Sequence, residues 1–186
     1  MPKLSKQEID EFLTEPGHIL RLATVDADGA PRVMPIWFIY EEGQIWMTSR
    51  EKSVWGDNML REPRVAITVD ENDLPWRKVA VQGRAQLAYD LGEDDKWRDR
   101  YRRMGYRYMT TEAVDAYVES TIDQPRRLFA VDLNDSANDV TSWRMPSDQE
   151  DISGIWAKRY YRPGTRMANN PTTGDEQWKM AKPDGA

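Results

Sequence analysis

The stretch from His18 to Ser49 alternates short apolar runs with tight turn signals. The runs are HILRLATV, APRVMPIWFIY and IWMTS, and the segments DADG and EEGQ separate them. The runs are rich in β-branched and aromatic residues, which favour strands. Gly29 and Gly43 supply the positive φ that tight hairpin turns require. This pattern predicts a β-meander with short hairpins, and hence a mainly β fold.

Helical patterns flank the meander on both sides. Ser5 and Glu8 form a capping-box pattern, and the apolar spacing that follows predicts a helix over residues 5–14. A second helix is expected over about 51–61. Residues 92–121 also look helical, with acidic residues early and basic residues late, and a break between two helices is expected within them.

Further strands are expected after the second helix. RVAITVDE and RRLFAVDLN read as strands, and DVTSWRM is a candidate for another. Between them, RKVAVQGRAQLAYD alternates apolar and polar residues, which predicts a half-buried strand with Gly83 at a bulge or a point of close approach. The positions expected to face one way are Val79, Val81, Ala85 and Leu87.

Composition excludes several classes of function. The chain of 186 residues contains no cysteine, which rules out disulfides, zinc–thiolate sites, iron–sulfur clusters and thiol catalysis. Its formal net charge of -6 argues against general nucleic-acid affinity. No run approaches the ~20 apolar residues of a membrane span, and the N-terminus has no apolar signal-peptide core. We therefore expect a cytoplasmic protein that binds neither nucleic acid nor membranes.

The length suits one domain with an appended segment. Residues 1–145 carry the strand and helix patterns, with 92–121 as a helical insertion. From Pro146 the chain turns to Pro, Gly, Asn, Asp and Thr, interrupted by aromatic residues. We expect an aromatic-containing C-terminal tail over 146–186, which either folds back over the body or a partner subunit or is partly disordered.

The chain offers few side chains for direct catalysis. His18 is its only histidine and opens an apolar run, so a surface or satisfied edge histidine is a better interpretation than a catalytic one. Neither GxGxxG nor GxxxxGK[ST] is present, and no metal site is expected. The basic and aromatic residues of 96–108 favour an exposed amphipathic helix, with a substrate- or phosphate-facing role as the alternative. An enzyme of this kind would have to borrow its reactivity from a cofactor.

The order and spacing of several pieces between His18 and Leu87 carry a resemblance to a known family. The pieces are DADG-x-P, P-x-W-F, the strand-end pair Thr48-Ser49, N-M-L-R-E-P-R-V and V-x-V-Q-G-R-A. Together they resemble the pyridoxamine 5′-phosphate oxidase-like, FMN/F420-binding split-barrel family. The resemblance implies a mainly β protein with flanking helices, a six-stranded antiparallel split β-barrel, and a homodimer with flavin sites at its interface.

The resemblance also implies which residues contact the cofactor. The strand whose backbone lies along the flavin ring in relatives corresponds here to Arg32, Val33, Met34, Pro35, Ile36 and Trp37. Thr48 and Ser49 match a hydroxyl pair that contacts the phosphate, and Lys78 matches a polar cofactor contact. Where many relatives place a phosphate-binding lysine, this chain has Trp55, and the nearest cations are Arg50 and Lys52.

These residue types also suit the cofactor on physical grounds. A flavin needs an apolar slot for its rings and cations and hydroxyls for its phosphate. Pro35 cannot donate to a ladder, so its strand should be an edge or face a ligand there. The polar set expected beside a helix N-terminus, which attracts anions, is Arg32, Thr48, Ser49, Arg50, Lys52, Ser53 and Lys78. Each residue alone has a structural alternative, as core, helix cap or surface cation.

The function expected from these patterns is that of an FMN- or F420-dependent oxidoreductase, with FMN preferred and the substrate and catalytic residues unknown. The alternative is a non-catalytic flavin- or haem-binding module on the same barrel. Haem is disfavoured because His18 is the only imidazole available as an axial ligand. An unliganded interaction protein is a third possibility. Pyridoxamine 5′-phosphate oxidase activity itself is not expected, because that enzyme's C-terminal pattern is not found after residue 90.

Overall fold

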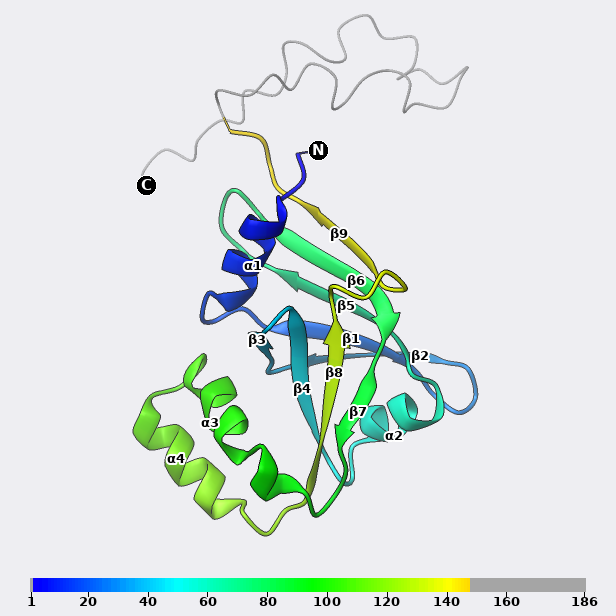
Figure 1. Cartoon of the computed structure of the whole chain (residues 1–186), viewed down its shortest axis with the longest axis vertical. Helices are drawn as coiled ribbons and strands as arrows, with labels where there is room; N and C mark the ends of the chain where they lie inside the picture. The colour runs from blue at the N-terminus through cyan, green and yellow to red at the C-terminus, as the bar shows by residue number, and fades with distance from the viewer. Residues whose placement is uncertain (1, 148–186) are drawn as a thin grey trace, which may run out of the picture. The chain divides into compact units, whose positions relative to one another are not determined.

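Two antiparallel sheets make up the body of the protein (Figure 1). The computed structural model describes residues 2–147. The strand order is β2-β1-β5-β6-β9 in the first sheet and β3-β4-β8-β7 in the second. The strands are β1 Leu20–Val25, β2 Pro31–Ile36, β3 Ile39–Glu41, β4 Gln44–Arg50, β5 Arg64–Asp70, β6 Lys78–Arg84, β7 Gln86–Tyr89, β8 Arg126–Asp132 and β9 Asp139–Trp143. The expected class, a mainly β split barrel, is confirmed.

The described residues form nine strands rather than six, because two apolar runs pass from one sheet to the other and each gives two strands, and because the candidate run DVTSWRM forms β9. Only Trp37 and Phe38 separate β2 from β3, and only Ala85 separates β6 from β7. Each run was expected as a single strand, and each turns a corner instead. These two corners join the sheets into one barrel.

The corner at Ala85 overturns one burial prediction. Val79 and Val81 are each 1% exposed, as the alternation predicts, but Leu87 is 40% exposed. Beyond Ala85 the chain belongs to the other sheet, so the face that β6 buries is not the face that β7 buries. Alternation alone could not reveal that change of sheet.

Gly83 is a point of close approach and not a bulge. It pairs with Val65 in an unbroken β5–β6 register. A Cβ at this position would lie 2.5 Å from Oδ1 of Asn138, so the Asn138 side chain would have to move to admit a larger residue. Of the two expectations for this glycine, the close approach is therefore confirmed.

The core lies between the two sheets. Its wholly or almost wholly buried side chains come from both, namely Leu20, Leu22, Ile67, Val69, Val79, Val81, Ile45, Met47, Phe129 and Val131. Helix α1, Lys6–Thr14, adds Phe12 and Leu13, both 0% exposed. The expected capping box is present, because Ser5 Oγ accepts from the Glu8 N–H and Glu8 Oε2 accepts from the Ser5 N–H.

Helix α2, Val54–Arg61, packs against both sheets at β1 and β4. It begins later than the expected residue 51, because residues 51–53 form a turn in which the Ser53 N–H donates to the Arg50 carbonyl. Gly56 allows the helix to approach β4, where a Cβ would meet Ser49. Asn58, 1% exposed, donates to Thr24 Oγ1 at 3.1 Å and Asp26 Oδ1 at 2.6 Å, and so fixes α2 on β1.

The 92–121 region forms two helices, as expected, after a short 3-10 turn at Asp94–Lys96. Helix α3 spans Arg98–Tyr106 and helix α4 spans Thr111–Ser120. Their buried residues Tyr101, Met104, Val114 and Val118, with Trp97 just before α3, join Ile39 and Leu128 in a second apolar cluster. The insertion therefore has its own small core against the second sheet.

Candidate functional site

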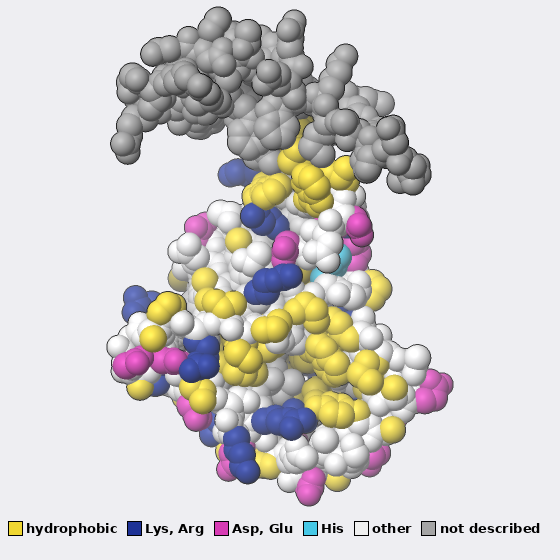
Figure 2. Space-filling model, turned by 180° about the vertical axis from the view of Figure 1, so that it is seen from behind, with side chains coloured by type: hydrophobic (Ala, Val, Ile, Leu, Met, Phe, Trp, Pro, Cys, Tyr) yellow, Lys and Arg dark blue, Asp and Glu magenta, His cyan; other side chains and the backbone are white. Residues whose placement is uncertain are grey.

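A groove of about 290 Å³ separates the edge strand β2 from the end of β4 and the start of α2. Its lining residues are Met34, Pro35, Ile36, Trp37, Thr48, Arg50, Ser53, Trp55, Tyr101 and Arg126. Apolar side chains spread over one face of the molecule, with basic side chains beside them (Figure 2). The volume is close to the lower end of the range for small-molecule sites.

The β2 wall of the groove is apolar and aromatic. Met34 and Ile36 lie on one face of β2 and are half-buried. Trp37 stacks on Tyr108 with ring centroids 5.2 Å apart, and it meets the edge of Tyr117 at 6.1 Å. These contacts hold the indole in place as one end of a wall on which a flat ring could lie.

Strand β2 pairs only with β1 in the part of the chain that is described, so its other edge has no strand beside it. This agrees with the edge position expected from Pro35. Pro31 and Pro35 have no N–H, and antiparallel bonding groups alternate along a strand. The bonds to β1 therefore fall at the alternate positions 32, 34 and 36. Val33, between the two prolines, keeps an N–H that points away from β1.

The opposite end of the groove is polar. Thr48 Oγ1 is buried and has no hydrogen-bond partner among the described residues. Ser53 is the N-cap residue of α2, and its side chain makes no capping bond. Trp55 of α2 contributes an indole where a lysine was the family expectation, so the cations of the groove come from other elements, Arg50 at the end of β4 and Arg126 at the start of β8.

Both guanidinium groups donate to one phenol oxygen. Arg50 Nη2 lies 2.9 Å from the Tyr117 hydroxyl, and Arg126 Nη2 lies 3.3 Å from it. Burial opposes ionisation of Tyr117, but the hydrogen bonds with Tyr101 and Arg50 and the charge of Arg126 outweigh it and lower the pKa to about 8. Burial and the neighbouring Tyr117 raise the pKa of Tyr101.

Several residues expected at the site do not line the groove of their own chain. Arg32 is held by Asp26 through Nε and Nη2 at 2.7–3.1 Å. Hydrogen bonds from Arg32 and then Asn58 lower the pKa of Asp26 to about 2. Val33 is 62% exposed and lies on the other face of β2 from Met34. Arg32 and Val33 therefore belong to β2 but do not line the groove.

Ser49, Lys52 and Lys78 are also elsewhere. Ser49 is 0% exposed, on the inner face of β4 against Gly56. Lys52 lines an adjoining cavity of about 480 Å³ that shares Arg50 with the groove. Lys78 Nζ lies 4.3 Å from the centre of the Trp143 ring. Of the hydroxyl pair expected to face a phosphate, the structure therefore brings only Thr48 to the groove.

Sequence reasoning singled out neither Tyr117 nor Arg126, and it included Tyr101 only in the 96–108 stretch, for which a substrate- or phosphate-facing role was the alternative. The preferred interpretation of 96–108 as an exposed amphipathic helix suits Arg103, which is 49% exposed and pairs with Glu41. Arg100, also paired with Glu41, is 22% exposed and lies 3.9 Å from the centre of the Trp46 ring. Arg126 opens a core strand, and its 5% exposure could have been anticipated only from that apolar context. No short motif links these three positions.

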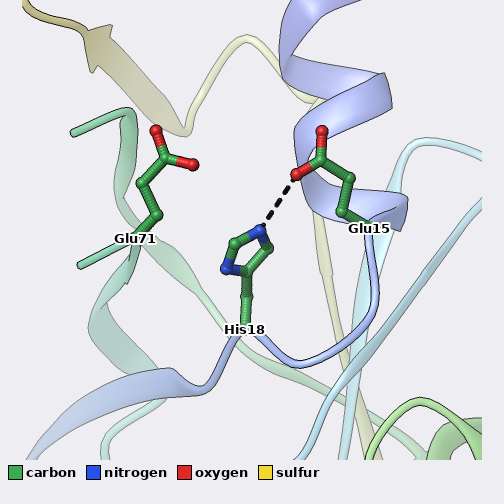
Figure 3. Close-up of side chains that lie close together, drawn as sticks. All are labelled: Glu15, His18 and Glu71. Atoms are coloured by element: carbon green, nitrogen blue, oxygen red, sulfur yellow. Dashed lines mark hydrogen bonds and ion pairs between the residues drawn. The ribbon is translucent and has the colours of Figure 1, made fainter. Parts of the chain in front are cut away.

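His18, the only histidine, lies away from the groove beside Glu15 and Glu71 (Figure 3). Its Nε2 is 3.2 Å from Glu15 Oε2, and its ring packs on Phe12 at 4.6 Å. The ligand atoms of the three residues lie within 4.8 Å of one another, as in a metal site. However, Arg77 donates to Glu15 at 2.8 Å and to Glu71 at 2.6 Å, so a guanidinium already neutralises these carboxylates. The cluster is a structural network between α1 and the β5–β6 connection.

The two sheets, their shared corners and the groove at an edge strand define a split barrel. The sequence matches the pyridoxamine 5′-phosphate oxidase family over residues 5–137, and the chain belongs to that family. No curated protein sequence matches the chain.

Solved structures share the fold at low sequence identity. A conserved hypothetical protein from Mycobacterium tuberculosis is 22% identical, with 81% of this chain and 94% of that chain covered and a TM-score of 0.60. An FAD-binding protein from Mesorhizobium loti is 23% identical over 78% and 97% of the two chains, with a TM-score of 0.54. HutZ, a haem storage protein from Vibrio cholerae, is 21% identical over 73% and 94%, with a TM-score of 0.53.

Proposed function

We propose that this protein binds FMN, or the deazaflavin F420, in the β2–β4–α2 groove and acts as an oxidoreductase on a small-molecule substrate. Family membership and the FAD-binding structural relative support a flavin-type ligand. The observation that carries the proposal is the division of the groove into an apolar wall and a cationic end with an unpartnered hydroxyl.

The apolar wall fits the ring system of such a cofactor. Met34 and Ile36 offer a half-buried face of β2, exposed Pro35 also lines the groove, and Trp37 closes it with an aromatic face. Flat conjugated rings gain most from surfaces of this kind. The N–H of Val33, which β1 does not use, is a backbone donor available at the same edge.

The polar end fits the anionic tail of the cofactor. Arg50 and Arg126 supply charge, Thr48 Oγ1 supplies an unused hydroxyl, and the N-terminus of α2 favours negative charge. FMN is preferred because its single phosphate matches a compact cationic end. F420 remains the second choice, since its tail is also anionic.

When bound, a flavin or deazaflavin supplies hydride transfer, which this chain's own side chains cannot provide. The chain's part is to hold the ring against β2 and to exclude water with Trp37 and Trp55. In this proposal the Val33 N–H, which β1 does not use, would stabilise negative charge on a reduced ring, as preorganised donors do in other sites. No described side chain is required as a proton donor for this step.

A homodimer belongs to the same proposal. The open edge of β2 and the 62% exposed Val33 are features that a second copy would cover. Lys78 lies outside the groove of its own chain and would contact the cofactor only across such an interface. Light scattering tests this directly, and a monomer at working concentration would contradict it.

Haem is not proposed as the ligand. His18 is the only imidazole of the chain, it is bound to Glu15, and it does not line the groove. The likeness to the haem storage protein concerns the fold.

The test is a titration of the purified protein with FMN, riboflavin and F420, followed by ligand fluorescence. We expect saturable FMN binding that Met34→Arg abolishes and that the matched control Leu87→Arg, on an exposed position of β7, leaves intact. Reduction of bound FMN by a nicotinamide donor would separate an enzyme from a binding module. Failure of all three ligands to bind at tens of micromolar would refute the proposal.

A further inference from the structure

The side chain of Trp37 packs on the helical insertion, whereas its chain neighbours pack in the main core. Ile36 and Phe38 both contact the apolar cluster that lies between the two sheets. Trp37 packs against the second cluster, to which α3 and α4 contribute most of the side chains. The aromatic end of the groove therefore depends on a part of the chain that the rest of the β2 wall does not use.

Tyr108, which follows α3 by two residues, makes the closest aromatic contact with Trp37. The two rings are stacked within 10° of parallel, with centroids 5.2 Å apart. Tyr117 of α4 meets the same indole at a steep angle of 70°, with centroids 6.1 Å apart. Because one neighbour covers a face and the other makes an edge contact, the two together fix both the tilt and the position of the indole.

The Tyr108 hydroxyl also holds the backbone from which Trp37 projects. It accepts from the Phe38 N–H at 3.2 Å and donates to the His18 carbonyl at 2.9 Å. Phe38 lies in the corner between β2 and β3, outside both strand ladders, and its side chain is 0% exposed. A backbone N–H at such a buried place is costly to leave unpaired. Burial raises the pKa of Tyr108, so the phenol keeps the proton that it donates.

The segment that carries Tyr108 is itself anchored on α1. The Arg107 guanidinium donates to three carbonyls at the C-terminal end of that helix, at 2.8–2.9 Å. The Arg107 carbonyl accepts from the Gly17 N–H at 3.0 Å. A cation at the last carbonyls of a helix is favourable. Tyr108 therefore extends from a fixed base, as a residue that orients another side chain must.

We propose that Tyr108 is a positioning residue for the groove, because its ring orients Trp37 and its hydroxyl fixes the β2–β3 corner that carries Trp37. Tyr108 is not among the residues that line the groove, so it acts on a bound ring only through Trp37. This gives the helical insertion a part in ligand binding. The identity of the bound ring rests on the proposed function, whereas the orientation of Trp37 does not.

The first test observes Trp37 with no cofactor present. The signal is tryptophan fluorescence and its quenching by acrylamide, each taken as the difference between a protein and the same protein carrying Trp37→Phe. In Tyr108→Leu the Trp37 emission should shift to longer wavelength and acrylamide should quench it more strongly, because the stacked face is opened to water. The matched control is Tyr106→Leu, at a 38% exposed position of α3, and it should change neither signal.

Tyr108→Phe keeps the stacked ring and removes both hydrogen bonds of the hydroxyl. It should also increase the quenching of Trp37, and it serves as the test if circular dichroism shows that Tyr108→Leu does not fold. Trp37 emission and quenching that stay at their wild-type values in the folded variant would overturn the proposal.

The second test measures riboflavin binding, because riboflavin has the ring of FMN without its phosphate. Tyr108→Leu and Trp37→Leu should each weaken riboflavin about three- to tenfold. The double variant should bind no more weakly than Trp37→Leu alone, because Tyr108 acts through Trp37. Additive losses would assign Tyr108 a merely structural role and overturn the proposal. If no flavin or deazaflavin binds but the Trp37 signal responds as expected, the proposed function fails and the positioning of Trp37 stands.

Discussion

Replacing Gly56 by alanine tests how closely α2 must approach β4. An added Cβ would lie 2.4 Å from Ser49 Oγ and 2.8 Å from Ser49 Cβ. Rotating the serine hydroxyl relieves only the first contact, because the Cβ is fixed to the strand backbone. Overpacking of this kind costs about 1–3 kcal/mol, whereas alanine gains about 1 kcal/mol in helix propensity. We expect a net loss of stability because the clash is with strand backbone geometry.

The assay is urea denaturation of Gly56→Ala, Ser49→Gly and the double variant. Ser49→Gly removes both clashing atoms, at a cost of about 0.5–1 kcal/mol for a glycine in a strand. The double variant should recover at least about 1 kcal/mol relative to the sum of the single changes, as contacting sites do. The Ser49 hydroxyl is buried and has no partner among the described residues, so its own loss should add little. Additive effects, or a Gly56→Ala protein more stable than the wild type, would refute the reasoning.

Three further substitutions test other contacts of the fold, at Asn58, Tyr117 and Arg77. Asn58→Ala should destabilise the fold by about 1–3 kcal/mol in urea, because it leaves the 3% exposed Thr24 without its amide donor. Asn58→Asp should be at least as unstable, because it places a second carboxylate beside that of Asp26. Tyr117 has its folded-state pKa lowered to about 8 from 10.0. The stability that this gives is complete above the unfolded pKa and is lost as the pH falls through the folded value. The difference in free energy of unfolding between the wild type and Tyr117→Phe should therefore grow as the pH rises from about 8 to 10. A difference that stays constant over this range would contradict the prediction. Arg77→Met should lower the melting temperature by freeing Glu15 and Glu71 from their shared guanidinium, whereas Arg64→Met, on the exposed Glu62 pair, should not.

Local rules predicted the elements well, because their signals lie within a few residues. The Ser5 capping box, the β1–β2 hairpin around Gly29 and the two helices of 92–121 depend on near neighbours alone. The corners at Trp37 and Ala85 depend on the other sheet, which no local pattern reveals. For that reason the strand count and the burial of Leu87 were wrong.

The groove was only partly predictable from sequence. Its β2 wall and Thr48 follow from strand order and alternation, which the family resemblance supplied. Arg126 lines the groove and Tyr117 accepts a hydrogen bond from its guanidinium, but no recognisable motif marks either position. The resemblance pairs Ser49 with Thr48, but the alternation of β4 turns Ser49 to the inner face, opposite Thr48. One residue of register decides between the core and the groove.

A crystal structure of the protein grown with FMN would test the central claim most directly. The account predicts the flavin ring against Met34, Pro35 and Ile36, with negative charge at the end lined by Arg50 and Arg126. Density for the ring at any other surface, or a groove that stays empty at saturating FMN, would contradict it.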